Sequence, residues 1–171
     1  MIKSRAKFAS LQRGYTLLEI LIVIGIIGIM AVTFYPNIMS TLETREFENA
    51  ARDVQSTLQR AKFMAVKTKL NHRVRFVNEA NRWVFFIERE DNPNQWNLMH
   101  GFIKKTISPK FKVNVNLPSQ AVAFSPLGVI LNFDSQQNSV TMKSFELESY
   151  DQPDQRIIYV FAGGSTQYIK S

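Results

Sequence analysis

An unbroken apolar segment near the N-terminus constrains this chain more than any other feature. Residues 15–35 are almost continuously apolar, whereas residues 1–14 are polar and carry four Lys and Arg residues. About 20 apolar residues are enough to cross a hydrocarbon core of roughly 30 Å as a helix. Because the basic residues flank the N-terminal side, we expect that side to stay in the cytoplasm and the C-terminal side to be exported.

A cleavable secretory signal is the alternative interpretation of this segment. Such a signal has an apolar core of about 7–15 residues followed by a small-x-small cleavage site. The apolar run here is longer, and the residues after it, Tyr35-Pro36-Asn37, do not form such a site. The run is therefore predicted to remain in the protein as a membrane-spanning helix.

One carboxylate, Glu19, interrupts the apolar run. An ionisable residue inside a membrane span is costly without a partner, so it marks a functional position by default. The alternative is an interfacial position at which Glu19 only contacts lipid headgroups. The residues that stand before Glu19 favour a functional role.

Those residues, Arg13-Gly14-Tyr15-Thr16-Leu17-Leu18-Glu19, resemble the processing site of type IV prepilins and pseudopilins. In that family a basic leader ends at a glycine, an aromatic residue follows, and a glutamate stands four positions after the aromatic. The resemblance covers residues 5–36. It implies that a membrane aspartic peptidase cuts between Gly14 and Tyr15, and that the same enzyme methylates the new amino group of Tyr15. The aromatic residue is usually Phe, so Tyr15 is a small departure.

The expected cleavage gives Glu19 a physical purpose. It would create a positive amine about one helical turn before Glu19, and two charges in hydrocarbon need partners. If Glu19 of one subunit meets the Tyr15 amine of a neighbour, both charges are neutralised and the axial register is set. We therefore expect Glu19 to act in assembly and not in catalysis.

Gly25, Gly28 and Pro36 lie within or just after the span. Glycine weakens a helix by about 1 kcal/mol and an interior proline by about 3 kcal/mol. Small residues also allow close packing of helices. Since filaments of the family often have a loosened helix in this region, the resemblance implies a candidate helix-melting segment between Gly28 and Pro36.

The rest of the chain has the composition of a soluble domain. The chain is therefore divided into a leader at residues 1–14, a membrane and assembly helix at residues 15–42, and a globular head at residues 43–171. One helix is predicted from about residue 16 to residue 70. In its second half, the apolar residues recur at steps of three and four, on one face that should pack on a sheet: Phe47, Ala51, Val54, Leu58, Ala61 and Ala65.

Alternating apolar and β-branched residues after this helix predict strands. A hairpin is expected from residues 73–77 and 82–88, and a long irregular loop at residues 90–109. The further predicted strands are residues 111–115, 121–124, 129–133, 140–147, 156–161 and 166–169. A helix followed by antiparallel strands is an α+β fold.

This order of elements also resembles the minor pseudopilin H and FimT/FimU-like group of the superfamily. The turn Ala123-Phe124-Ser125-Pro126-Leu127-Gly128 is similar to that group's Phe-x-x-x-Gly turn, and Gly163-Gly164 fits before a last strand. The resemblance implies a pilin-like fold in which the long N-terminal helix packs on an antiparallel sheet.

A run of cations without an intervening acid is the one nucleic-acid signal: Arg60, Lys62, Lys67, Lys69, Arg73 and Arg75. Such a run can bind phosphates, but it also suits a solvated helix end. DNA-binding FimT-like pilins carry a basic stretch after their last glycine, and here only Lys170 follows. Binding of nucleic acid is therefore not expected.

No other chemistry is expected. The absence of cysteine excludes disulfides and thiolate sites, and His72 and His100 do not have the spacing of zinc ligands. Asp151 and Asp154 could contact a calcium ion, although a polar turn is the favoured interpretation. No cofactor, metal or active site is predicted.

These observations predict a minor pseudopilin subunit of a type II protein secretion system. The resemblance implies a single-pass protein of the bacterial inner membrane whose head lies in the periplasm and joins a pseudopilus near its tip. Its expected partners are other pseudopilins or pilins, the prepilin peptidase and N-methyltransferase, and the inner-membrane assembly platform. The alternative is a minor pilin of a type IV pilus that primes assembly or binds DNA.

Overall fold

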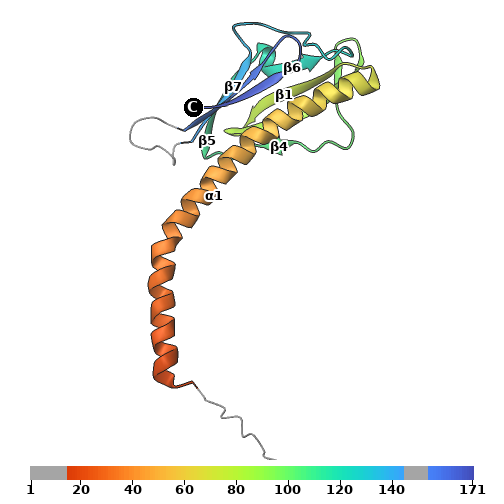
Figure 1. Cartoon of the computed structure of the whole chain (residues 1–171). Coiled ribbons are helices and arrows are strands. Elements are labelled where there is room, and N and C mark those ends of the chain that lie inside the picture. Colours follow the sequence, from red (N-terminus) through yellow and green to blue (C-terminus); the bar gives the residue numbers. More distant parts are fainter. Residues whose placement is uncertain (1–14, 145–153) are drawn as a thin grey trace, which may run out of the picture. The chain divides into compact units, whose positions relative to one another are not determined.

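The computed structural model describes residues 15–144 and 154–171. The chain divides into two compact units, residues 1–40 and residues 41–171, and one helix, α1 (Leu17–Thr68), contributes to both (Figure 1). The helix begins after Thr16, whose Oγ1 accepts the N–H of Glu19 at 3.2 Å. It ends at Thr68, because φ changes to 59° at Lys69 and the helical path stops there. The predicted long N-terminal helix is thus confirmed.

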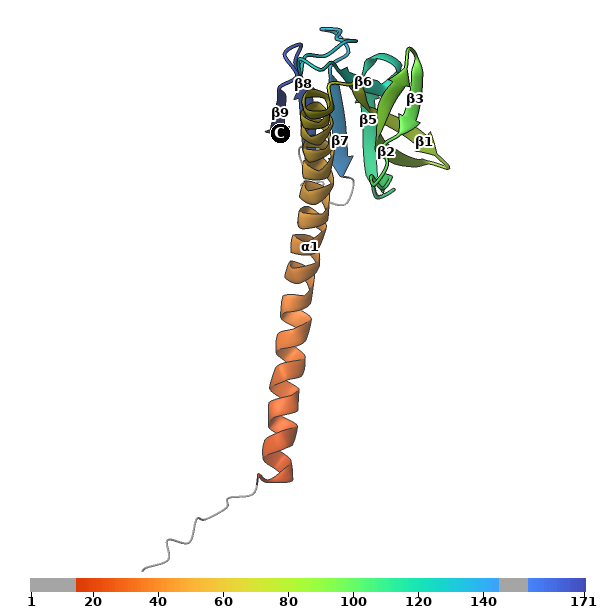
Figure 2. The ribbon, with the colours of Figure 1, turned by 90° about the vertical axis from the view of Figure 1, so that its right-hand side faces the viewer.

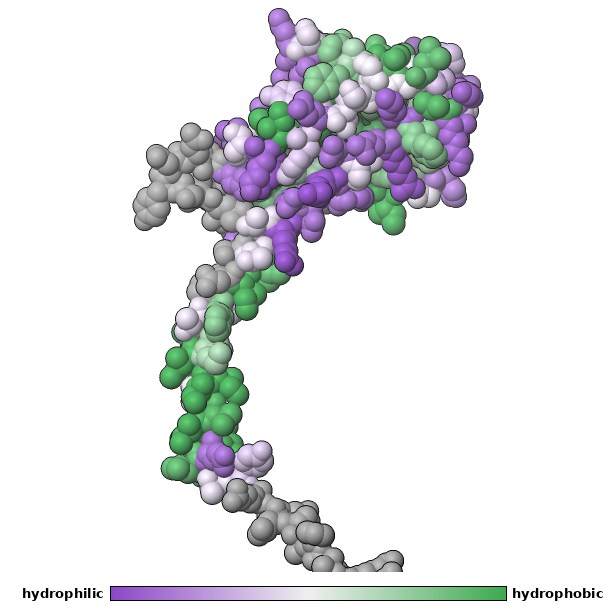
Figure 3. All heavy atoms as spheres, in the orientation of Figure 1, coloured by the Kyte–Doolittle hydropathy of each residue, from purple (hydrophilic) through white to green (hydrophobic). Residues whose placement is uncertain are grey.

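In the first unit, α1 is apolar on all sides. The segment Leu17–Tyr35 is 19 residues long, apolar enough to cross a membrane, and not buried by the rest of the chain. Figure 3 shows this part of the helix covered almost entirely by apolar side chains. A helix that is hydrophobic all round is stable only in apolar surroundings. The segment therefore fits a membrane anchor.

In the second unit, the described residues form nine antiparallel strands in two sheets, where the sequence suggested one. The first sheet has the order β3-β2-β1-β6, with β4 also paired to β2, and the second has the order β5-β7-β8-β9. The bounds of the first sheet's strands are β1 His72–Glu79, β2 Arg82–Asn92, β3 Gln95–Leu98, β4 Lys105–Thr106 and β6 Ala121–Phe124. Those of the second are β5 Phe111–Asn116, β7 Ser139–Ser144, β8 Gln155–Val160 and β9 Thr166–Lys170. A short 3₁₀ turn, η1 (Pro118–Gln120), precedes β6.

The core of this unit forms where α1 meets the sheets (Figure 2). Every residue of the predicted apolar stripe is completely buried: Phe47, Ala51, Val54, Leu58, Ala61 and Ala65. The ring of Phe47 lies 4.9 Å from that of Phe111 on β5, so the stripe contacts the second sheet directly. The stripe mixes large side chains with alanines, which lets the helix approach the strands closely. The predicted packing face is confirmed.

A contact between two turns closes the far end of the head. The carbonyl oxygen of Gly128 lies so near Gly164 that a Cβ there would stand 2.1 Å from it. Gly164 also has φ of 72°, so only glycine fits this position. Lys62 of α1 completes the contact, because its Nζ donates a hydrogen bond to the carbonyl oxygen of Gly163 at 3.0 Å. The end of α1, the turn after β6 and the β8–β9 turn are thereby joined.

The predicted loop at residues 90–109 was wrong. Strand β2 continues to Asn92, and β3 and β4 both pair with it. The polar side chains of this stretch are typical of a loop, but they form a β-hairpin. Asn94 shapes its turn: its φ is 64°, and its N–H donates a hydrogen bond to Glu90 Oε1 at 2.7 Å. Trp96 on β3 is anchored under the guanidinium of Arg73, 4.3 Å from its ring centre.

The predicted strand at residues 129–133 was also wrong. Only an isolated bridge between Phe124 and Ile130 forms there. Backbone bonds join Ser125 to Val129 and Leu131 to Ala123. Beyond them the side chain of Asn132 takes over, because its amide oxygen accepts the N–H of Ala123 and its amide nitrogen donates to the carbonyl of Ala121. The predicted strands at residues 111–115, 121–124, 156–161 and 166–169 correspond to observed ones, while the end of the strand predicted at residues 140–147 lies outside the described residues.

Deleting residues 1–42 should leave a soluble, folded head, since the core residues all lie in the second unit. We expect one cooperative unfolding transition when the fluorescence of Trp83 and Trp96 is followed in urea. Leu58→Ala in this fragment should lower the free energy of unfolding by about 2–5 kcal/mol. The matched change at the exposed Phe63, Phe63→Ala, should alter it by less than about 0.5 kcal/mol. An insoluble fragment would place the domain boundary elsewhere.

Candidate functional site

The first candidate site is the start of α1, at Tyr15, Thr16 and Glu19. Gly14 lies outside the described residues. Thr16 caps the helix, so the Glu19 N–H is satisfied by the side chain and the carbonyl of Thr16, at 3.2 and 3.1 Å. The side chains of Tyr15 and Glu19 are exposed, and Glu19 has no ion-pair partner among the residues that the structure describes.

The place of Glu19 in the first turn of α1 supports its expected role in assembly. A carboxylate in the first turn of a helix is favoured by the helix dipole, which limits the cost of the charge. The side chains around it, such as Leu18, Ile20 and Ile22, are apolar and exposed. A charge held at the start of an apolar helix can be satisfied by a cation on a second molecule, which is the chemistry that the assembly hypothesis requires.

The candidate helix-melting residues lie within continuous helix. α1 runs without interruption through Gly25, Gly28 and Pro36, and a Cβ at either glycine would meet no atom within 4 Å. The Thr33 hydroxyl donates to the Ile29 carbonyl at 2.9 Å, a bond that commonly bends helices. Melting of this segment within a filament stays a prediction.

Three of the six candidate cations lie on the last turns of α1, and each has a local contact. Arg60 lies over the ring of Phe102, 5.3 Å from its centre. Lys62 is bonded to Gly163, and Lys67 lies over Phe63 at 5.9 Å. These contacts are modest in energy, on the order of 1 kcal/mol for an exposed cation and ring.

The other three cations lie in different parts of the head and differ in their contacts. Arg73 makes an ion pair with Glu88 at 2.5 Å and stacks on Trp96, so it belongs to the first sheet. Arg75 is exposed on β1, and Lys69 follows the end of the helix. The six residues therefore do not form one continuous track of free cations, and their use in binding nucleic acid stays a weak prediction.

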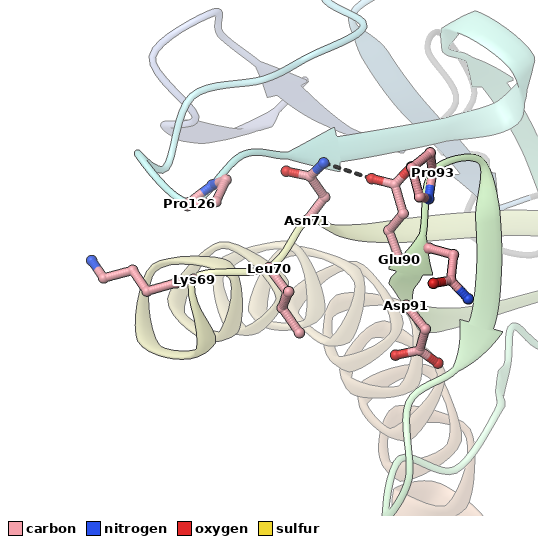
Figure 4. A pocket seen from close by; sticks show the side chains of 8 residues that line it. Lys69, Leu70, Asn71, Glu90, Asp91, Pro93 and Pro126 are labelled. Atoms are coloured by element: carbon pink, nitrogen blue, oxygen red, sulfur yellow. Dashed lines mark hydrogen bonds between the residues drawn. The ribbon is translucent and has the colours of Figure 1, made fainter.

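A pocket beyond the end of α1 is lined by polar groups that are already engaged (Figure 4). Asn71 Nδ2 donates to Glu90 Oε2 at 2.6 Å, and this bond, with the one from the Asn94 N–H, lowers the pKa of Glu90. Asp91 accepts from Arg89 at 2.5 Å and from Asn97 at 2.9 Å. The pocket thus lies where the end of α1 meets the β2–β3 hairpin, and its hydrogen bonds connect these two elements. Among the described residues, no group of three or more His, Cys, Asp or Glu side chains is placed so that it could hold a metal ion.

Sequence reasoning missed a buried ion pair next to the helix. Arg156 on β8 is almost completely buried, pairs with Asp154, and lies 5.0 Å from the centre of the Phe47 ring. Burial lowers the pKa of the Arg156 guanidinium, but the bond to Asp154 and the nearby Tyr168 raise it above its ordinary value. Alternation could have revealed the pair, because Arg156 shares a strand face with Ile158 and Val160. Asp151 lies outside the described residues, and Asp154 is committed to this pair.

His72 is a second buried polar residue, at the start of β1. Its Nδ1 lies 3.0 Å from the carbonyl oxygen of Leu70, so that nitrogen carries the proton and donates. Its Nε2 is buried without a hydrogen-bond partner among the described residues. Burial, with a smaller contribution from Arg89, lowers the pKa of His72 from its ordinary 6.5. The neutral imidazole is therefore the form that the fold requires.

The start of the chain matches a known motif. Residues 9–35 match the family described as the prokaryotic N-terminal methylation motif. Two relatives are similar over the same part of the chain. The type II secretion system core protein G of Escherichia coli (strain K12) is 46% identical over 43 residues, which are 25% of this chain and 30% of that protein. The core protein G of Pectobacterium carotovorum subsp. carotovorum is 44% identical over 45 residues, 26% of this chain and 29% of that protein. The matched segment spans less than a third of either relative.

The fold matches a solved structure. That of the minor pseudopilin EpsH from the Type 2 Secretion System of Vibrio cholerae matches with a TM-score of 0.53, covering 73% of this chain and 97% of that one. The two sequences are 12% identical, so this likeness concerns the fold alone. The predicted α+β, pilin-like fold is confirmed. The N-terminal motif and the pilin-like fold both agree with the predicted resemblance to type IV pilin-like proteins.

The free energy of unfolding of the head should fall as the pH is lowered, because of His72. The folded state holds the pKa of His72 below 6.5, so below that pH the unfolded chain binds more protons than the folded one. The contribution of His72 is therefore present above pH 6.5 and is lost as the pH falls through the folded pKa. His72→Asn keeps a donor for the Leu70 carbonyl but cannot titrate, and it should flatten urea midpoints measured between about pH 7.5 and 5. His100→Gln, at an exposed site, is the control and should leave the slope unchanged.

Proposed function

We propose that this protein is a minor pseudopilin of a type II protein secretion system, a structural subunit with no reaction of its own. The methylation motif at residues 9–35 is the observation that carries the proposal. Two further likenesses support the proposal. The head has a fold similar to that of a minor pseudopilin, and the N-terminal part of the chain is similar to core protein G. Under this proposal the subunit stands in the periplasmic pseudopilus near its tip.

Processing comes first in the proposed pathway. The peptidase cuts between Gly14 and Tyr15, and the amino group of Tyr15 is methylated. The leader side stays cytoplasmic because of its basic residues, the segment Leu17–Tyr35 crosses the inner membrane, and the head lies in the periplasm. Other pseudopilins, the processing enzyme and the inner-membrane assembly platform are the partners that this pathway requires.

Charge pairing then guides assembly. Glu19 is exposed on an apolar helix and has no ion-pair partner among the described residues, while the new Tyr15 amine of a neighbouring subunit carries the opposite charge. In hydrocarbon, each of these charges is costly alone and is stabilised by the other. Pairing therefore favours one axial offset between adjacent helices over all others.

The second candidate is a minor pilin of a type IV pilus, because the methylation motif does not distinguish the two systems. Four of the six candidate cations are occupied by ring, carbonyl or carboxylate contacts within the head. That observation favours secretion over DNA binding. Affinity for DNA that falls steeply as salt rises would favour the pilus.

Glu19→Gln should leave cleavage intact but prevent incorporation into filaments. Breaking a buried ion pair costs on the order of 3 kcal/mol, which corresponds to roughly a hundredfold loss of assembled subunit. The measurement is the amount of the chain in the sheared filament fraction relative to the membrane fraction. Glu79→Gln, which removes an exposed carboxylate from the head, is the control. Normal incorporation of the Glu19 variant would refute charge pairing.

Gly14→Leu should block processing, because the peptidase of the resembled family cuts after a glycine. Intact mass and N-terminal sequencing of the protein recovered from membranes give the readout. The unaltered chain should begin with N-methylated Tyr15, and the variant should retain residues 1–14. A mature-sized product from the variant would place the cleavage site elsewhere.

A further inference from the structure

The end of the head at which α1 terminates carries apolar side chains that the core does not use. Phe63 and Val66 lie three residues apart on one face of α1, and the side chain of Phe63 is 61% exposed. The turn after β6 lies against this face, because a Cβ on Gly128 would stand 3.3 Å from the side chain of Val66. Leu127, next to Gly128, is 86% exposed.

The segment after this turn extends the apolar surface. Val129, Leu131 and Phe133 are exposed at every second position. Ile130 packs against the core, and its N–H donates to the turn between β8 and β9 at 2.9 Å. Figure 3 shows apolar side chains at this end of the head among hydrophilic ones. Such a patch is typical of a protein interaction site. We call it the distal apolar face, and it consists of Phe63, Val66, Leu127, Val129, Leu131 and Phe133.

The chain segments that meet at this end carry positive charge only. Residues 54–78 contain six Lys and Arg residues and no Asp or Glu, and residues 113–133 and 155–171 also lack Asp and Glu. Lys67 borders the distal apolar face, since its Nζ lies 5.9 Å from the centre of the Phe63 ring. Contact with a ring leaves the charge of a lysine uncompensated, so the border of the face is positive.

The acids at the edges of this region are engaged in local bonds. Asp91 lines the pocket beyond the end of α1 and is paired with Arg89. Asp134 follows the distal apolar face and accepts the N–H of Gln136 at 2.8 Å. Neither acid pairs with Lys67, which has no ion-pair partner among the described residues.

A positive border around an apolar centre selects a partner whose apolar surface is bordered by acids. A second copy of this chain does not offer one. Two distal apolar faces would bring like charges together, which is unfavourable. The hollow that Glu46 lines at the other end of the head is also lined by Arg45, and its Asp53 is already paired with Lys105.

The position of the face within the head also bears on its partner. From Thr41, where the second unit begins, α1 runs to Thr68, a distance of about 40 Å at 1.5 Å per residue. The distal apolar face stands at the end of this run. In a filament, subunits contact those placed further along the axis, and the neighbours of a minor subunit are other chains.

We propose that the distal apolar face binds an acid-bordered apolar surface on the head of a different pilin-like subunit, the next one along the filament. The inference rests on the proposed function, because it assigns the head contact that would accompany the Tyr15–Glu19 pairing. In this contact Leu127 and Leu131 meet the apolar centre of the partner's surface, and Lys67 faces its carboxylates.

The absence of cysteine from the chain allows a single probe to be placed on this face. Full-length Leu127→Cys is labelled with a cysteine-directed benzophenone in cells that assemble the filament, and is then irradiated. We expect one main adduct, in which mass spectrometry identifies a different chain that begins with an N-methylated residue and is joined through a peptide containing Asp or Glu. Leu98→Cys, on β3 and 49% exposed, is the control and should not give this adduct.

Charge reversal tests the role of the positive border. Lys67→Glu in the Leu127→Cys chain should lower the yield of the adduct at least about tenfold, because like charges then face one another. Lys67→Arg keeps the charge and should retain the adduct. Lys143→Glu, at an exposed site on β7, makes the same change on another face and should leave the yield unaltered.

Several results would overturn the proposed contact. They are an adduct with a second copy of this chain, with lipid, or with a protein that lacks an N-methylated first residue. A Leu127→Cys chain that gives no more adduct than Leu98→Cys overturns it as well, and so does an unchanged yield in Lys67→Glu.

N-terminal sequencing and the sheared filament fraction of the same cells separate the two proposals. A processed chain that enters filaments in a Glu19-dependent way, but gives no adduct from Leu127→Cys, would overturn the contact and leave the proposed function standing. A chain that retains residues 1–14 and stays out of filaments would overturn both.

Discussion

The burial of one helical stripe against two sheets is the interaction on which the head depends. Phe47, Val54 and Leu58 reach the strands because the alanines between them keep the helix close. The same helix is apolar all round from Leu17 to Tyr35. After Thr41 one apolar face is completely buried and the remaining surface is mixed, with Phe63 61% exposed. The first part of this helix is thus suited to lipid, and the second part is suited to packing against the sheets. The change in the pattern of apolar residues marks the boundary between the two parts.

The charged residues of the head are mostly used to complete the fold. Arg73 stacks on Trp96 and forms an ion pair with Glu88. Arg156 forms an ion pair with Asp154 and lies over the ring of Phe47, and Lys62 donates a hydrogen bond to the β8–β9 turn. The composition gives a net charge of +7, which at first suggests an anionic partner. The contacts show that much of this positive charge is committed locally, which is why the cationic run of residues 60–75 is a poor guide to function.

Patterns with a strict period were predictable from sequence, and features that depend on single side chains were not. The stripe of α1 and strand β6 (Ala121–Phe124) follow directly from spacing and composition. The hairpin of β2 and β3 has polar strands and an asparagine turn, so its composition indicates a loop. Residues 129–133 have strand composition, yet their backbone pairing stops at Leu131, and the amide of Asn132 bonds to Ala121 and Ala123 instead. The partition into two sheets also depends on distant pairings that no local pattern contains.

The candidate site shows the same division. Tyr15 and Glu19 were identified because a charge in an apolar run is conspicuous, and because the residues around it resemble a known processing site. Arg156 escaped notice, since an arginine on a strand is ordinarily taken as exposed. Its place on the same strand face as Ile158 and Val160 was the available signal, and Asp154 and Phe47 beside it explain its burial.

The bond between Lys62 and Gly163 has a consequence for the timing of folding. It joins two residues that lie 101 positions apart in the chain. Contacts of such long sequence separation form only after the intervening chain is available. The helix end and the β8–β9 turn therefore cannot be locked together before the segment that carries Gly163 has been made. A chain that stops before Gly163 lacks this closure, so it does not offer the finished surface.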